Sequence, residues 1–172
     1  KIEYIYAFKG TDKFSLKDWN ENLQQIITGK SKQYKQASVG AQLLSSNDNL
    51  KGVSFTGHSL GGGMASVAAL TTQGKAVTFN AAGLSDQTRE NLQLTGKQAR
   101  INAYVIEGEI VDYMQSTLGL KAEGNITYLP ASYFPSIPNT KIDDIIRTGQ
   151  RIKNHLIDAV LEKYGEYRGW QW

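Results

Sequence analysis

The chain has 172 residues, of which 40% are hydrophobic and 20% are charged, the balance of an ordinary globular domain. Its 19 basic and 16 acidic residues leave a net charge of +3, too small to indicate a nucleic-acid partner. The chain has no cysteine, which excludes disulfides, thiolate metal sites and a cysteine nucleophile. We expect one domain over residues 1–172. Because the chain begins in mid-element without a methionine, we expect it to be excised from a longer protein.

The amino-terminal part of the chain is predicted to form a strand and two helices. Residues 2–8 are rich in aromatic side chains and predict a buried strand, followed by a glycine-containing loop. Ser15 and Asp18 have capping-box spacing and predict a helix through about residue 27. A second helix is predicted over residues 31–45, where apolar side chains recur at helical spacing.

The segment over residues 52–70 carries the strongest chemical signal. A short run of strand formers leads into Gly57-His58-Ser59-Leu60-Gly61, and a small-residue helical segment follows. A serine on such a strand–turn–helix has its hydroxyl exposed above the sheet, as a nucleophile requires. Three consecutive glycines in a helix cost stability, so their presence predicts that backbone segments pack closely there.

The remaining elements alternate between strands and helices. Strands are predicted over residues 76–79, 101–106 and 126–129, and helices over residues 86–94 and from residue 142 onward. This alternation predicts an α/β fold, a three-layer sandwich with a small, mostly parallel sheet and right-handed crossovers.

A serine nucleophile needs a general base, and only two histidines are available. His58 is adjacent to Ser59, and we expect its side chain to point away from the serine hydroxyl. His155 is therefore the predicted base. Since such a histidine usually lies in a loop or at a helix start, we expect a chain break near Lys153 and Asn154, with Asn154 capping the last helix.

The acid that orients the base is expected between Ser59 and His155, at the carboxyl end of a strand. Glu107, Glu109 and Asp112 follow the strand over residues 101–106. Glu109 lies on the turn and is the first choice. Asp112 is the alternative acid, because aspartate is the commoner residue in this role. The alternative interpretation of all three is that they are surface charges.

Backbone amides must bind the oxyanion that forms in acyl transfer. The amide of Leu60, directly after the nucleophile, is one expected donor. The loop at Gly10 and Thr11 is expected to supply the second donor through Thr11; its alternative reading is a simple turn.

These motifs resemble the class 3 lipase family of α/β-hydrolases. The resemblance rests on YAFKGT at residues 6–11, DWNENL at residues 18–23, TGHSLGG at residues 56–62, the segment after Glu109, and His155. It implies an oxyanion loop, a lid helix and a triad acid at Glu109. Phe14, Leu16 and Trp19 would form a lid that meets lipid; core packing is the alternative for Trp19. Two features depart from the family: glutamate stands where aspartate is usual, and the family's amino-terminal strands and helix are missing.

A second resemblance concerns biological setting. GGGMAS at residues 61–66 and TFNAAGL at residues 78–84 resemble lipase-like domains at the carboxyl ends of bacterial polymorphic toxins and secreted effectors. This implies a domain that is secreted or delivered by a bacterial secretion system, that contacts membranes peripherally, and that an immunity protein neutralises.

The sequence thus predicts a serine ester hydrolase of membrane lipids, most simply a phospholipase A-type enzyme, that needs no metal or organic cofactor. A soluble-ester hydrolase or acyltransferase on the same site is the alternative enzyme. A non-catalytic binding module on a hydrolase scaffold is the alternative from another class.

Overall fold

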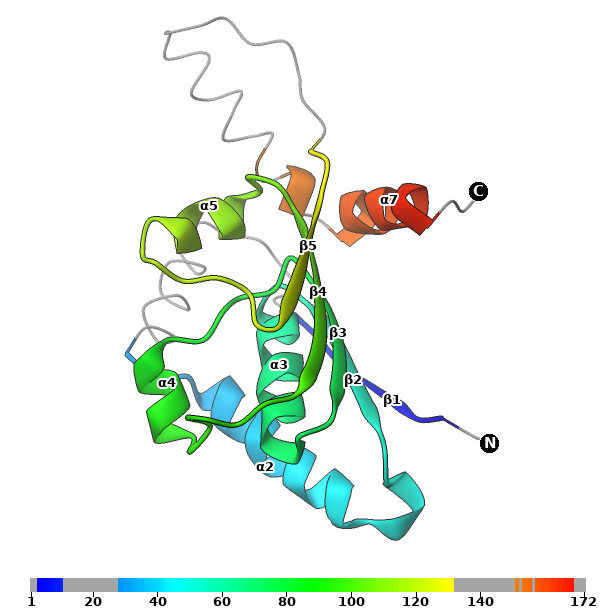
Figure 1. Cartoon of the computed structure of the whole chain (residues 1–172), viewed down its shortest axis with the longest axis vertical. Coiled ribbons are helices and arrows are strands. Elements are labelled where there is room, and N and C mark those ends of the chain that lie inside the picture. Colours follow the sequence, from blue (N-terminus) through cyan, green and yellow to red (C-terminus); the bar gives the residue numbers. More distant parts are fainter. Residues whose placement is uncertain (1–2, 11–27, 132–150, 152, 156, 169–172) are drawn as a thin grey trace, which may run out of the picture.

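The structure is a computed structural model that describes residues 3–10, 28–131, 151, 153–155 and 157–168 (Figure 1). The helix predicted over residues 15–27 lies outside these residues. Thr11 and the expected lid residues Phe14, Leu16 and Trp19 lie outside them as well.

A five-stranded sheet forms the centre of the described chain. Its strands are β1 (Ile5–Phe8), β2 (Ser54–His58), β3 (Lys75–Phe79), β4 (Arg100–Ile106) and β5 (Asn125–Leu129). They lie in the order β1-β2-β3-β4-β5, and each neighbouring pair is parallel. The predicted parallel sheet is confirmed.

Strand order decides where the helices lie. The connections contain α2 (Lys32–Ser46) with the short 3₁₀ turn η1 (Asp48–Leu50), α3 (Leu60–Thr72), α4 (Asp86–Asn91) and α5 (Ile110–Ser116). Because each new strand is added on the same side of the previous one, right-handed crossovers place all four helices on one face of the sheet. Figure 1 shows them together on that face, with α7 (Ile157–Arg168) on the other side.

Helix α7 completes the third layer. Its residue Val160 is fully buried and packs with Ile106 of β4 and Leu129 of β5. Tyr164, one turn further along α7, contacts the rings of Phe79 and Tyr104 edge-on. The predicted three-layer α/β arrangement is therefore confirmed.

Serine caps start two of the connecting helices. The Ser31 hydroxyl accepts from the amide of Tyr34 at the start of α2, and the Ser85 hydroxyl accepts from the amide of Thr88 at the start of α4. Helix α4 ends three residues earlier than predicted. Its end is followed by Gln93, whose φ of 55° is left-handed and incompatible with a continuing helix.

The prediction that residues 2–8 form a buried strand is wrong in its burial. Strand β1 is the edge of the sheet, and Ile5 is 70% exposed. Tyr4 and Tyr6 are also exposed. Aromatic and β-branched residues favour an extended backbone whether or not a neighbour covers them, so the sequence pattern identified the strand but not its place in the sheet.

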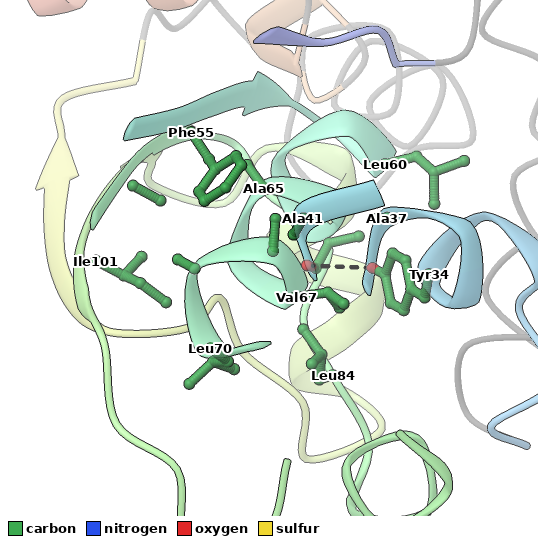
Figure 2. Packing of buried hydrophobic residues seen from close by; sticks show 14 of the residues in the cluster. Tyr34, Ala37, Ala41, Phe55, Leu60, Ala65, Val67, Leu70, Leu84 and Ile101 are labelled. Carbon is green, nitrogen blue, oxygen red and sulfur yellow. Dashed lines mark hydrogen bonds between the residues drawn. The ribbon is translucent and has the colours of Figure 1, made fainter. Parts of the chain in front are cut away.

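The main core lies between the sheet and the closely packed helices α2 and α3 (Figure 2). Tyr34 is fully buried there, and its hydroxyl donates to the carbonyl of Gly83 at 3.3 Å and, at 3.5 Å, to that of Ala82. Burial raises the pKa of Tyr34 well above its usual value, so the hydroxyl remains a donor. This contact ties α2 to the loop that follows β3.

Among the described residues, we find no helix with the length and apolar character needed to cross a lipid bilayer.

Gly63 and Gly40 provide a matched test of this packing. A Cβ on Gly63 would lie 2.7 Å from the Tyr34 ring carbon Cζ and 2.8 Å from the carbonyl oxygen of Ala82. We expect Gly63→Ala to lower the free energy of unfolding by about 2 kcal/mol through overpacking. A Cβ on Gly40 in α2 meets nothing within 4 Å, so Gly40→Ala should raise it by up to about 1 kcal/mol through helix propensity. Urea denaturation measures both, and a Gly63→Ala protein as stable as wild type would contradict the packing described.

Candidate active site

Ser59 sits on a sharp turn between β2 and α3. Its φ of 59° and ψ of −127° lie in a region that non-glycine residues rarely adopt. Its amide donates to the carbonyl of Phe79 at 3.0 Å, and its own carbonyl accepts from the amides of Gly63 at 3.1 Å and Ala82 at 3.0 Å. Backbone contacts to two neighbouring segments thus hold the strained turn in place.

The glycines around Ser59 permit the close approach that the sequence predicted. A Cβ on Gly57 would overlap the backbone of Gly61. One on Gly61 would overlap the carbonyl of Phe8, and one on Gly62 would lie 2.7 Å from the Cβ of Ala81. Three backbone segments therefore meet at the turn with no room for side chains.

His155 lies against Ser59, from which it is separated by 96 positions in the chain. Its Nε2 is 2.9 Å from the Ser59 Oγ, and its Nδ1 is 2.5 Å from Oε2 of Glu109. A carboxylate only accepts hydrogen bonds, so Nδ1 carries the proton. Nε2 then has the free lone pair that accepts the Ser59 hydroxyl. All three side chains are buried, Glu109 completely.

Backbone amides hold Glu109 in this position. It is the N-cap of α5, where Oε1 accepts from the amide of Asp112 at 2.7 Å and Oε2 from the amide of Val111 at 2.9 Å. These two hydrogen bonds fix the position of the carboxylate, whose Oε2 also contacts Nδ1 of His155.

The other candidate acids do not reach His155 in this way. Asp112 Oδ2 accepts from the amide of Gly108 at 3.2 Å and so closes the turn that carries Glu109. Burial raises the pKa of Asp112, an effect that this hydrogen bond partly offsets. Glu107 is exposed. The structure brings Glu109, and not the alternative Asp112, to the histidine.

The predicted chain break is misplaced. Residues 153–155 are helical, so the chain does not break at Lys153 and Asn154. Asn154 is 3% exposed and lies inside the helical turn, so it does not cap the last helix. Its backbone carbonyl accepts a hydrogen bond from the side chain of Asn80. Asn154 thus contributes to the site through its backbone.

The amide of Leu60, the expected first oxyanion donor, lies at the start of α3 next to Ser59. The amide of Gly63 makes the first backbone bond of α3, to the carbonyl of Ser59, and the Leu60 amide precedes it at the helix start. On the opposite side, a Cβ on Gly10 would lie 3.7 Å from the Ser59 Cβ. The loop after β1 therefore passes beside the nucleophile. Thr11, the expected second donor, lies outside the described residues and stays a prediction.

Two residues of the site were not recognised from the sequence as part of it. The first is Asn80, which is 1% exposed and whose side-chain carboxamide forms hydrogen bonds with two other backbone segments. The second is His58, whose Nε2 lies 2.6 Å from the carbonyl oxygen of His155. The one sequence feature that points to Asn80 is its position as a polar residue directly after a short apolar strand.

His58 is held in its neutral form. Burial, reinforced by the nearby His155, lowers the pKa of His58 to about 4, against the hydrogen bond to the His155 carbonyl, which raises it. Since a carbonyl only accepts, Nε2 of His58 carries its proton.

The described residues contain no cluster of three or more histidine, aspartate or glutamate side chains able to hold a metal ion. What they do contain is a continuous chain of hydrogen bonds from a buried carboxylate through an imidazole to a serine hydroxyl at a helix start. Such a chain activates a serine for attack on an acyl carbonyl.

Two comparisons with known proteins agree with this chemistry. Residues 1–162 match a family model described as a Tle-like phospholipase domain, a range that contains Ser59, Glu109 and His155. The chain is also 31% identical, over 185 aligned residues, to a protein of Serratia liquefaciens named Extracellular phospholipase A1. That alignment covers 98% of this chain and 54% of the relative, so the chain spans about half the relative's length.

Replacement of the two acids separates their roles. We expect Glu109→Gln to lower kcat about a thousandfold or more, because an amide cannot hold the proton on Nδ1 of His155 as a carboxylate does. Asp112→Asn keeps an acceptor for the Gly108 amide and should change kcat less than tenfold. Steady-state hydrolysis of a chromogenic ester measures both. A larger loss in Asp112→Asn than in Glu109→Gln would reverse the assignment.

The lowered pKa of His58 predicts a pH-dependent stability. The unfolded chain binds this proton near pH 6.5, but the folded chain binds it only near pH 4. The unfolded state is therefore favoured as pH falls between these values, by on the order of 2–3 kcal/mol in total. His58→Gln removes this pH-dependent contribution. The free energy of unfolding of the variant should therefore lie closer to that of wild type at pH 4.5 than at pH 7. Urea denaturation at both pH values measures the difference between variant and wild type, and an equal difference at both would contradict the burial of a neutral His58.

Proposed function

Because the chain belongs to the Tle-like phospholipase domain family, we propose that Ser59, His155 and Glu109 hydrolyse a phospholipid ester through a serine-bound acyl intermediate. Membership of the family supports the sequence-based prediction of a lipase-type ester hydrolase. The observation that carries the residue assignment is the hydrogen-bond chain of 2.9 Å and 2.5 Å from Ser59 through His155 to Glu109.

The first half-reaction forms the acyl-enzyme. The Ser59 Oγ attacks the ester carbonyl carbon while its proton passes to Nε2 of His155. Glu109 stabilises the imidazolium that results. The amides of Leu60 and, as we propose, Thr11 bind the oxyanion, a pair of donors that lowers the barrier by several kcal/mol. The intermediate collapses as His155 protonates the departing alcohol oxygen, which leaves as lysophospholipid.

The second half-reaction regenerates the serine. Water loses a proton to Nε2 of His155 and attacks the acyl carbonyl, and a second tetrahedral oxyanion forms in the same amide pair. Its collapse returns the proton to the Ser59 Oγ and releases a fatty acid. No step requires a group beyond these residues and water.

The proposed substrate position is the sn-1 ester. This rests on the relative named Extracellular phospholipase A1, with which the chain shares 31% identity. We propose peripheral contact with the lipid surface, in which Phe14, Leu16 and Trp19 act as an apolar lid.

The proposed biological setting is secretion. The name of the extracellular relative and the resemblance to toxin domains both support a protein that is exported, in the second case as part of a larger effector with an antibacterial role. An immunity protein that blocks the site belongs to the same proposal.

Hydrolysis of phospholipid vesicles tests the function. We expect the chain to release fatty acid from the sn-1 position of phosphatidylethanolamine–phosphatidylglycerol vesicles. Ser59→Ala and His155→Ala should each lower the rate at least a thousandfold, because the first removes the nucleophile and the second removes its general base. Ser46→Ala, an exposed serine on α2, is the control and should match wild type.

Two results would overturn parts of this proposal. Folded protein that cleaves soluble esters but no vesicle lipid would replace the phospholipase assignment with a soluble-ester hydrolase. Full activity in the Ser59→Ala variant would remove the serine mechanism itself.

A further inference from the structure

Two side chains from different parts of the fold converge on the backbone of His155. The Asn80 Nδ2 donates to the carbonyl of Asn154 at 3.1 Å and approaches that of His155 at 3.5 Å. From the turn next to the nucleophile, the His58 Nε2 donates to the same His155 carbonyl at 2.6 Å. Asn80, Asn154 and His155 are each at most 3% exposed. The backbone of the histidine is thus anchored independently of its ring.

The other end of Asn80 reaches the strand that carries the acid. Its Oδ1 accepts from the amide of Ile106 at 2.8 Å, and the carbonyl of Ile106 accepts from the amide of Glu109 at 3.2 Å. The backbone amide of Asn80 donates to the carbonyl of Tyr104 at 2.8 Å. One side chain therefore connects the segment that bears His155 with the turn that bears Glu109.

We propose that Asn80 and His58 are positioning residues that hold the backbone of His155 in register with Glu109 and Ser59. The proposal rests on the proposed triad. Neither residue contacts the ester. They set where the imidazole sits, so that its Nδ1 faces the carboxylate while its Nε2 faces the hydroxyl.

The chemistry of Asn80 matches this role more closely than a packing role. Ile106 offers a donor and Asn154 offers an acceptor, and only an amide of this length supplies an acceptor and a donor at the same time. Burial of such a group is costly unless its hydrogen bonds are made. An apolar residue could fill the same space but would make neither hydrogen bond, so packing alone does not explain an asparagine at this position.

The anchoring has a geometric reason. Glu109 and His155 are 46 positions apart in the chain. Helix α7, which follows His155, packs through Val160 on the carboxyl-terminal residues of β4 and β5. A displacement of about 1 Å between catalytic groups can cost a hundredfold in rate. The backbone hydrogen bonds of Asn80 and His58 limit that displacement at the histidine itself, in addition to the packing of Val160 on Ile106 and Leu129.

Asn80→Asp tests the link most directly. Aspartate tolerates the φ of 41° at this position and still accepts from the Ile106 amide, but it replaces the donor with an oxygen that faces two carbonyl oxygens. We expect kcat per active site, titrated with a fluorophosphonate, to fall about a hundredfold while KM changes less than threefold. Thr78→Val is the matched control: it lies on the preceding strand, is fully buried, and makes no hydrogen bond to the His155 segment among the described residues. Its kcat should equal that of wild type.

A second pair tests His58 without removing bulk. His58→Phe keeps a ring beside the His155 ring, whose centroid is 4.8 Å away, but loses the donor. His58→Gln retains an N–H that can reach the carbonyl. We expect His58→Phe to lose at least tenfold in kcat per titrated site and His58→Gln to recover most of that loss. If Asn80→Asp does not fold, this pair decides the question.

A spectroscopic readout separates positioning from general stability. The His155 Nδ1 proton in its 2.5 Å bond to Glu109 should give a far-downfield proton resonance that is absent from His155→Ala. We expect it to weaken or shift in Asn80→Asp and to remain in Thr78→Val. Wild-type kcat per site and an unchanged resonance in both Asn80→Asp and His58→Phe would overturn the positioning role and leave the triad standing. A wild-type protein that is not labelled at Ser59 would instead remove the triad and this proposal together.

Discussion

The backbone of Ser59 is held in a conformation with φ 59° and ψ −127°, which costs an L residue about 1–3 kcal/mol. Three hydrogen bonds through the Ser59 amide and carbonyl offset that cost, and they come from the loop after β3 and the first turn of α3. Gly57, Gly61 and Gly62 let those segments approach. The strained turn therefore depends on the whole centre of the sheet, and the serine hydroxyl is presented at a fixed point above it.

Sheet topology determines how the other groups reach that point. Consecutive parallel strands place all the described connecting helices on one face, so α7 and the residues just before it pack on the other. The acid follows β4 at the carboxyl edge of the sheet, and the histidine arrives from the last part of the described chain. Chain segments from the two faces of the sheet thus come together next to Ser59. The hydrogen bonds of Asn80 and His58 to residues 154–155 lie at this place.

The sequence predicted most of what local chemistry controls. The strand–turn–helix at Ser59 and the alternation of strands and helices depend on neighbouring residues, and His155 followed by elimination from two histidines. The exposure of β1 and the contacts of Asn80 depend on residues far apart in the chain, which no local pattern encodes. The length of α4 was overestimated because left-handed Gln93 has no glycine-like signal. The roles of Ser59, His155 and Glu109 remain proposals that the geometry supports.

A glutamate at the acid position is explained by how its side chain is tied. Both carboxylate oxygens of Glu109 accept amides of the following turn, so the side chain folds back over its own backbone. In this arrangement Oε2 lies 2.5 Å from Nδ1 of His155. Asp112 then serves the turn itself, as an acceptor for Gly108, whose φ of 66° favours glycine. The two carboxylates thus have different roles: Asp112 closes the turn, and Glu109 faces the histidine.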